Sequence, residues 1–237
     1  MKKVFLGVGH GGADKGAIAN GFYEKDLNLS IALSCRDVLE RHGVTVLMSR
    51  TKDENDTLTD EIKECNAFAP DLAVDIHNNA VGDHDGDGEG DGDGAEVFYF
   101  SGGGTSKTLA ENIISEIVKI GQNSRGIKTR LNSYRTDWYG FIRETYAPAA
   151  IVECVFIDNK TDLQIIDTEA EQKAMGVAIA KGILLTLGIA YVEEKPIANN
   201  GKYYRVQIGA FSREEGAKET LRKAKAAGFT DAFIKYC

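Results

Sequence analysis

The sequence contains few cysteines and no long hydrophobic run. Its four cysteines, at positions 35, 65, 154 and 237, are far apart and lie mostly within apolar periodic segments. This pattern favours free thiols that pack as small hydrophobic residues rather than a disulfide framework. It therefore indicates a reducing compartment at synthesis. No segment reaches the roughly 20 consecutive apolar residues that a membrane-spanning helix needs. We therefore expect no membrane span.

The N-terminus also lacks a secretory signal pattern. Lys2 and Lys3 precede only a short apolar run, Val4 to Val8, and no small-residue cleavage site follows it. The sequence therefore predicts a protein that is synthesised in the cytoplasm without a signal peptide.

A third feature that is missing is an excess of basic residues. The formal net charge is -8, which argues against a nucleic-acid partner because such proteins normally present a basic face to the phosphates. The acidic excess belongs to the first part of the chain, since basic residues outnumber acidic ones from Ile197 onward. A chain of 237 residues that is 43% hydrophobic is expected to form one large domain plus a small fragment.

What the sequence does contain is an alternation of β-rich apolar runs and helical periodicities. The runs that predict strands are KVFLGV, VTVLMS, DLAVDIH, AEVFYF and AAIVECVF. Helices are predicted at residues 26–43, 58–69, 105–120 and 169–187, the first of them capped by Asp26 or Asn28. Short apolar runs separated by helices of this length predict an α/β fold, a mostly parallel twisted sheet with helices on both faces.

Metal-competent side chains lie near the ends of several predicted elements. His10 follows the first strand, His77 ends the third, Glu153 lies within the last, and Glu24 stands just before the first long helix. Functional groups of a parallel sheet gather at the carboxyl ends of its strands. Two imidazoles and a carboxylate are the ligand set of a catalytic zinc, and another carboxylate can take a proton from the water. Taken singly, each residue is more often an ordinary core or surface residue, so spacing alone leaves both interpretations open.

The glycines of LGVGHGG raise a different interpretation. Gly7, Gly9 and Gly12 have the G-x-G-x-x-G spacing of a dinucleotide-binding turn. That fingerprint needs a helix at the third glycine and an acid at the end of the second strand. Here the residues ADKGAIANGFYEKD separate the glycines from the first predicted helix. The second strand ends near Arg50 instead of an acid, and an arginine there could accommodate the 2'-phosphate of a cofactor. The context favours a tight, side-chain-free bend that lets His10 point at a metal and leaves room for a bulky glycan.

Over about its first 188 residues the chain resembles the zinc-dependent N-acetylmuramoyl-L-alanine amidases of the amidase-3 family. The matching stretches follow the family's order and spacing: GHGGADKGA, FYEKDLNL, GVTVLMSRT, IHNNA, GAE, RGIK and PAAIVECVFIDN. The resemblance implies an enzyme that hydrolyses the bond between N-acetylmuramic acid and the L-alanine of the peptidoglycan stem peptide.

The resemblance also implies a role for individual residues. His10, Glu24 and His77 match the family's zinc ligands, and Glu153 matches its catalytic glutamate, which passes a proton from water to the departing nitrogen. Arg143 matches a common arginine of the family, which either pairs with a carboxylate of the stem peptide or forms a structural salt bridge.

The chain departs from the family pattern at a few positions. The family usually has Asp-Pro where this chain has Gly7 and Val8, serine in place of Asp75, and often glycine in place of Val155. None of these differences removes a ligand or the base. Asp75 lies two residues from His77 on the same strand face, where it serves either as a partner of that imidazole or in a surface ion pair.

An acidic, glycine-rich insert precedes the strand AEVFYF. In it, five residues fall at positions one, three, five, six and twelve of a calcium-loop pattern: Asp85, Asp87, Glu89, Gly90 and Glu96. No predicted helix flanks the pattern, and alternating glycine and acid favour a mobile segment. The sequence leaves open whether residues 83–94 bind calcium.

The C-terminal part has the composition of a linker and a small module. Residues 190–201 include Pro196 and polar residues, so we expect a catalytic domain at 1–189 followed by this linker. Residues 202–237 resemble the first half of a SPOR repeat, a module that binds peptidoglycan strands without stem peptides. One β-α-β unit leaves a sheet edge unpaired, which predicts a homodimer through this half-module.

Three functions compete at this stage. The first is a zinc-dependent peptidoglycan amidase, either a phage or prophage endolysin that acts on the wall after release or a bacterial autolysin of sporulation or mother-cell lysis. The second is a non-catalytic wall-binding protein, against which the intact set of His10, Glu24, His77 and Glu153 argues. The third is the dinucleotide-binding enzyme suggested by the glycines.

Overall fold

The protein forms two compact units, Met1–Val192 and Glu193–Cys237. The structure is a computed structural model that describes residues 1–82, 84, 88–194, 209–226, 229 and 232–234. Within the described residues, no helix is both long enough and apolar enough to cross a membrane. The finer division into a domain at 1–189, a linker and a module at 202–237 stays a prediction.

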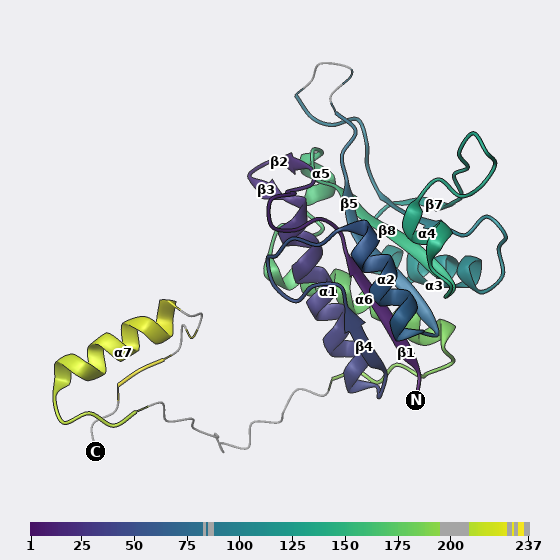
Figure 1. The fold of residues 1–237 in the computed structure, drawn as a ribbon. Coiled ribbons are helices and arrows are strands. Elements are labelled where there is room, and N and C mark those ends of the chain that lie inside the picture. The colour runs from purple at the N-terminus through teal and green to yellow at the C-terminus, as the bar shows by residue number, and fades with distance from the viewer. Residues whose placement is uncertain (83, 85–87, 195–208, 227–228, 230–231, 235–237) are drawn as a thin grey trace. The chain divides into compact units, whose positions relative to one another are not determined.

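A six-stranded sheet in the order β4-β1-β5-β8-β6-β7 forms the centre of the first unit (Figure 1). Its strands are β1 (Lys3–Val8), β4 (Thr45–Met48), β5 (Leu72–Asn79), β6 (Ala95–Tyr99), β7 (Ser124–Lys128) and β8 (Ala149–Phe156). All neighbours run parallel except β6 and β8, which are antiparallel. The predicted mostly parallel sheet is confirmed.

Helices cover both faces of this sheet, as predicted (Figure 1). The larger apolar layer brings together α1 (Glu24–Arg41), α3 (Thr105–Lys119) and α6 (Glu169–Thr186). A second, aromatic-rich layer on the other face includes side chains of α2 (Leu58–Phe68) and α4 (Gly140–Glu144). The short helix α5 (Lys160–Leu163) follows β8.

The long helices form where apolar residues recur at helical spacing. In α3, Leu109, Ile113 and Ile117 are fully buried, because residues three or four apart share one helix face. The helix α2 begins after Thr57, whose side chain accepts from the Asp60 backbone N–H. It ends at Phe68, and the C-cap residue Ala69 has φ of 51° and directly precedes a proline.

The start of α1 differs from the sequence prediction. The helix begins at Glu24 with Tyr23 at the N-cap position, so neither Asp26 nor Asn28 caps it. A two-stranded ribbon, β2 (Ile18–Ala19) and β3 (Phe22–Tyr23), leads into it. The ribbon fills the interval that separates the glycine-rich turn from the helix, so no helix begins at the third glycine. Because the helix begins at residue 24, the glutamate there is fixed on its first turn.

The second unit contains α7 (Glu214–Ala226). Of the β-α-β unit predicted there, the flanking strands lie largely outside the described residues. Three of the four cysteines, Cys35, Cys65 and Cys154, are buried free thiols, as predicted, and Cys237 lies outside the described residues.

Candidate metal centre

His10 lies in the turn directly after β1. The backbone there has φ of 64°, a left-handed conformation that is uncommon for a residue with a side chain and is often found at functional sites. Its Nε2 lies 3.1 Å from Glu24 Oε2, and its Nδ1 lies 2.9 Å from Asp14 Oδ2. The turn therefore directs one ring nitrogen into the protein and the other toward an exposed aspartate.

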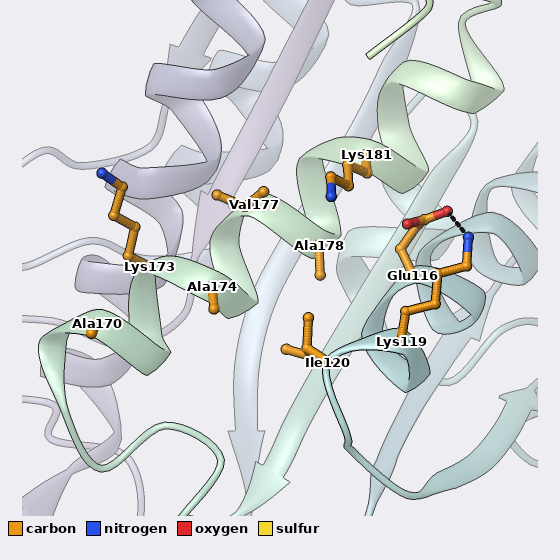
Figure 2. A pocket seen from close by; sticks show the side chains of 9 residues that line it. All are labelled: Glu116, Lys119, Ile120, Ala170, Lys173, Ala174, Val177, Ala178 and Lys181. Atoms are coloured by element: carbon orange, nitrogen blue, oxygen red, sulfur yellow. Dashed lines mark hydrogen bonds and ion pairs between the residues drawn. The ribbon is translucent and has the colours of Figure 1, made fainter. Parts of the chain in front are cut away.

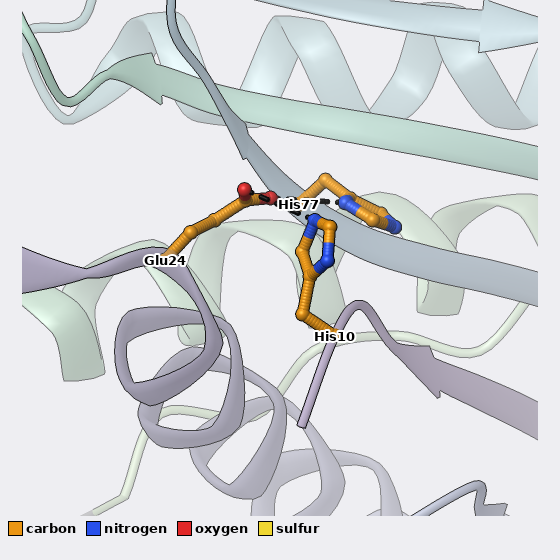
Figure 3. Close-up of side chains that lie close together, drawn as sticks. All are labelled: His10, Glu24 and His77. Atoms are coloured by element: carbon orange, nitrogen blue, oxygen red, sulfur yellow. Dashed lines mark hydrogen bonds and ion pairs between the residues drawn. The ribbon is translucent and has the colours of Figure 1, made fainter. Parts of the chain in front are cut away.

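Glu24 contacts both imidazoles of the site through its carboxylate (Figure 3). Its Oε1 lies 3.0 Å from His77 Nδ1, and its Oε2 accepts from the Ala17 backbone N–H. Burial alone would raise the pKa of Glu24, but the hydrogen bonds and charges of the imidazoles of His10 and His77 outweigh this effect and hold the pKa well below its usual range. Glu24 is therefore a buried carboxylate that remains ionised.

His77 points inward from β5 and lies between two carboxylates. Its Nδ1 faces Glu24, while its Nε2 lies 3.2 Å from Asp75 Oδ2. Burial would lower the pKa of His77, but the carboxylates of Asp75 and Glu24 raise it well above the usual value. The rings of His10 and His77 meet edge to face, with centroids 5.1 Å apart.

These three residues fit a metal ion. One donor atom from each of His10, Glu24 and His77 lies within 4.8 Å of the other two, and Figure 3 shows the three side chains converging from separate elements. Two imidazoles and a carboxylate are the donors of catalytic zinc sites, which leave the fourth tetrahedral position open. The three candidate ligands named from the sequence are thus brought together.

Glu153 lies next to this group on the adjacent strand. It pairs in register with His77 across the parallel β5–β8 ladder and with Glu96 across the antiparallel β8–β6 ladder. Burial raises the pKa of Glu153 to about 7 against the opposing charge of His77, and the carboxylates of Glu24 and Glu96 also act to raise it. A carboxyl group with this pKa can both accept and donate a proton near neutral pH.

Arg50 holds the turn that carries His10. Its guanidinium is buried and donates to the backbone carbonyls of Val8 at 3.1 Å, Gly9 at 3.2 Å and Lys25 at 2.7 Å. In the dinucleotide interpretation, Arg50 would face the phosphate of a cofactor. In the structure it is buried and donates to backbone carbonyls instead. It links the end of β1 to the first turn of α1.

Two buried asparagines were missed by the sequence reasoning. Asn28 donates to the Gly9 carbonyl at 3.0 Å and accepts from Asn78 Nδ2 at 2.8 Å, and the Asn78 backbone N–H donates to Glu24 Oε1 at 3.2 Å. Asn28 lies one turn after Glu24, so its helical spacing was the signal that could have identified it.

Arg143 lies on α4, where it donates to backbone carbonyls. The guanidinium contacts the carbonyls of Asp137 and Trp138 at 2.8 and 2.9 Å and Glu144 Oε1 at 2.6 Å. The sequence left two roles open for Arg143, a contact with the substrate and a structural salt bridge. The contact with Glu144 is of the second kind.

Glu96, the last position of the calcium-loop pattern, is a β6 residue with other partners. Its carboxylate accepts from Asn79 Nδ2 at 3.1 Å and Arg125 Nε at 3.0 Å, and it also pairs with Lys128. Asp85 and Asp87 lie outside the described residues.

A groove lies between α3 and α6 (Figure 2). It is lined by Glu116, Lys119, Ile120, Ala170, Lys173, Ala174, Val177, Ala178 and Lys181. None of the three candidate metal ligands lines it.

The sequence matches two family models. The model described as N-acetylmuramoyl-L-alanine amidase matches residues 4–184, and a SPOR domain model matches residues 181–236. The first match covers more than half of the chain and contains all of the site residues described above.

Curated relatives and solved structures agree with this assignment. The chain is 33% identical to the N-acetylmuramoyl-L-alanine amidase CwlM of Bacillus licheniformis, over 100% of this chain and 85% of that protein. It is 32% identical to a sporulation-specific N-acetylmuramoyl-L-alanine amidase of Bacillus subtilis, over 97% and 83%, and 32% identical to an endolysin of Bacillus phage SPP1, over 79% and 67%.

The fold is that of known amidase catalytic domains. The catalytic domain of CwlV, an N-acetylmuramoyl-L-alanine amidase from Bacillus (Paenibacillus) polymyxa, superposes with a TM-score of 0.69 at 27% identity, over 80% of this chain and 100% of that one. Sequence, fold and the grouping of metal-competent residues thus agree, and the chain belongs to the N-acetylmuramoyl-L-alanine amidase family, whose members are peptidoglycan hydrolases.

Proposed function

We propose that this enzyme cleaves the amide bond between N-acetylmuramic acid and L-alanine with a zinc ion held by His10, Glu24 and His77. The observation that supports this most directly is that three donor atoms converge beside Glu153, which is aligned with His77 across one strand pair. A zinc ion bound by these residues would supply a Lewis acid for the amide carbonyl and a nucleophilic water near neutral pH.

Glu153 would move the protons of the reaction. With a pKa near 7, its carboxylate can accept a proton from the attacking water and return it to the nitrogen of the departing alanine. That second transfer matters because an unprotonated amine anion is a very poor leaving group. Glu24 does not suit this role, since its pKa is held well below the usual range and it stays ionised.

The substrate role of Arg143 stays a prediction. Its guanidinium already donates to two backbone carbonyls and to Glu144, and a carboxylate of the stem peptide would have to share these donors. The structural interpretation therefore has the direct support of these contacts.

The reaction is tested by the ends that it creates. Purified cell walls digested with the enzyme are expected to gain alanine amino termini, measured by labelling free amines, and no new reducing sugar ends. A chelator should abolish the gain, and added zinc should restore it. New reducing ends, or activity that is indifferent to the chelator, would overturn the proposal.

A pair of histidine variants separates the metal centre from general damage. His10→Ala should behave like the chelated enzyme, because it removes one of three ligands. His42→Ala should keep its activity, because that ring lies at the end of α1, where its Nδ1 contacts the Val38 carbonyl at 2.7 Å.

Two biological roles suit such an amidase. The endolysin interpretation is supported by the 32% identity to the endolysin of Bacillus phage SPP1. The role of a bacterial autolysin in sporulation is favoured by coverage, because the sporulation-specific relative matches 97% of this chain and the phage endolysin 79%.

We propose that the C-terminal half-module pairs with a second copy of the chain. The support is a set of exposed aromatic side chains in the second unit, Phe211, Phe229 and Phe233, which are 47%, 67% and 66% exposed. Single exposed apolar residues are common, but three large ones in so short a unit leave apolar area that a partner can cover. A shared sheet would also pair the edges that half a SPOR repeat leaves open.

Sedimentation of the full chain tests this pairing. A particle of twice the 25.7 kDa chain mass is expected at micromolar concentration, and a Phe229→Glu/Phe233→Glu variant should sediment as a monomer with its amidase activity intact in solution. A wild-type chain that remains monomeric at high concentration would contradict the proposal.

A further inference from the structure

Asp75 is a buried carboxylate that contacts one of the candidate metal ligands. We infer that Asp75 is a positioning residue, which holds the His77 ring so that Nδ1 faces the metal and Nε2 carries the proton. This inference rests on the proposed zinc site.

The geometry gives each nitrogen of His77 its own partner. Nε2 lies 3.2 Å from Asp75 Oδ2, and Nδ1 lies 3.0 Å from Glu24 Oε1. An imidazole that ligates a metal normally donates its other N–H to a carboxylate or a carbonyl, which fixes the tautomer and the ring orientation. Residues 75 and 77 project to the same face because side chains alternate along β5. The strand itself therefore sets Asp75 beside the ring.

The arrangement has a counterpart at His10, with the two nitrogens exchanged. There Nδ1 contacts Asp14 Oδ2 at 2.9 Å and Nε2 faces Glu24 at 3.1 Å. The Asp14 side chain is 68% exposed, whereas that of Asp75 is 4% exposed. Because water competes with the exposed contact, the buried aspartate should fix its imidazole more firmly.

A glycine on the neighbouring strand makes room for this carboxylate. Gly7 is the register partner of Asp75 across the β1–β5 ladder. A Cβ atom at position 7 would lie 2.7 Å from Asp75 Oδ1 and 2.0 Å from Glu61 Oε1. Any side chain at position 7 would therefore displace Asp75 or Glu61.

The two carboxyl groups over Gly7 are poorly satisfied, which argues against a purely structural role. Asp75 Oδ1 and Glu61 Oε1 are buried and accept no hydrogen bond from the described residues. Burial, together with the nearby Asp75 charge, raises the pKa of Glu61 well above its usual range. A buried carboxylate without hydrogen-bond partners costs stability. The contact that Asp75 does make is the one between its Oδ2 and His77 Nε2.

The test compares the zinc affinity of two aspartate variants of the full chain. Asp75→Asn is expected to weaken zinc binding about 10- to 100-fold, measured by competition with a chromophoric chelator at fixed pH. Asp71→Asn is the matched control, because Asp71 precedes the same strand but bonds to Lys2 Nζ and the Lys3 backbone N–H. Its affinity should equal that of the wild type.

Several outcomes would overturn the inference. Equal zinc affinity of Asp75→Asn and wild type would do so, as would a variant that is less stable without metal yet binds zinc normally. If the wild type itself binds no zinc, the proposed function fails instead.

A measurement on the unaltered protein guards against a variant that does not fold. In the zinc-loaded wild type with 15N-labelled histidine, long-range couplings should place the His77 proton on Nε2 and the His10 proton on Nδ1. A His77 proton on Nδ1 would contradict the inference without any substitution.

Discussion

Glu153→Gln is expected to lower the rate of wall hydrolysis by a factor on the order of 10² to 10⁴, the usual contribution of a general acid–base group. Glutamine keeps the size of the side chain but can neither accept the proton of water nor pass one to the leaving nitrogen. Because Glu153 is not one of the three converging donors, zinc affinity should stay near that of the wild type. The measurement pairs the release of alanine amino termini with a zinc titration.

Glu144→Gln supplies the control for Glu153→Gln. Glu144 is an exposed carboxylate at the end of α4 and forms an ion pair with Arg143. Because it is not among the converging donors, loss of its charge should leave hydrolysis almost unchanged. A Glu153→Gln enzyme that keeps most of its rate would falsify the assignment of the base. Loss of zinc together with activity would instead mean that Glu153 supports the metal.

The fold could be predicted because its long elements carry strong periodic signals. The apolar runs at Lys3–Val8 and Leu72–Asn79 became the neighbouring strands β1 and β5, and their order placed His10 and His77 at one edge. The elements that were not predicted, such as α4 and α5, have only five and four residues. That length is too short for a helical period to appear.

The supporting residues of the site could not be predicted, because their roles depend on register and on contacts distant in sequence. Arg50 bonds to Gly9 and Lys25, which are 41 and 25 residues away. The sequence placed Asp75 on the face of His77 but left a surface ion pair open as its role. Its burial follows from pairing with a glycine on β1, and strand pairing is not encoded in local spacing.

The glycine before His10 is expected to tolerate no side chain, and Gly9→Ala should lose both zinc binding and activity. A Cβ atom there would lie 2.2 to 2.5 Å from three atoms of the His77 ring. The backbone cannot move aside easily, because the Gly9 N–H donates to the Ile76 carbonyl and its own carbonyl accepts from Asn28 and Arg50. The ring must therefore shift, which disturbs its contacts with Glu24 and Asp75.

A displacement of about 1 Å in a catalytic constellation can cost on the order of 10²-fold in rate, which sets the minimum loss expected for Gly9→Ala. Gly43→Ala is the matched control. Its φ of 76° strains alanine, but a Cβ there meets no atom within 4 Å, so stability should fall while zinc affinity stays unchanged. The backbone of Gly9 is not left-handed, so its φ does not explain why position 9 needs a glycine. The glycine, which is part of a nucleotide-like spacing, is instead required because the His77 ring packs against it. Wild-type zinc affinity in Gly9→Ala would refute that explanation.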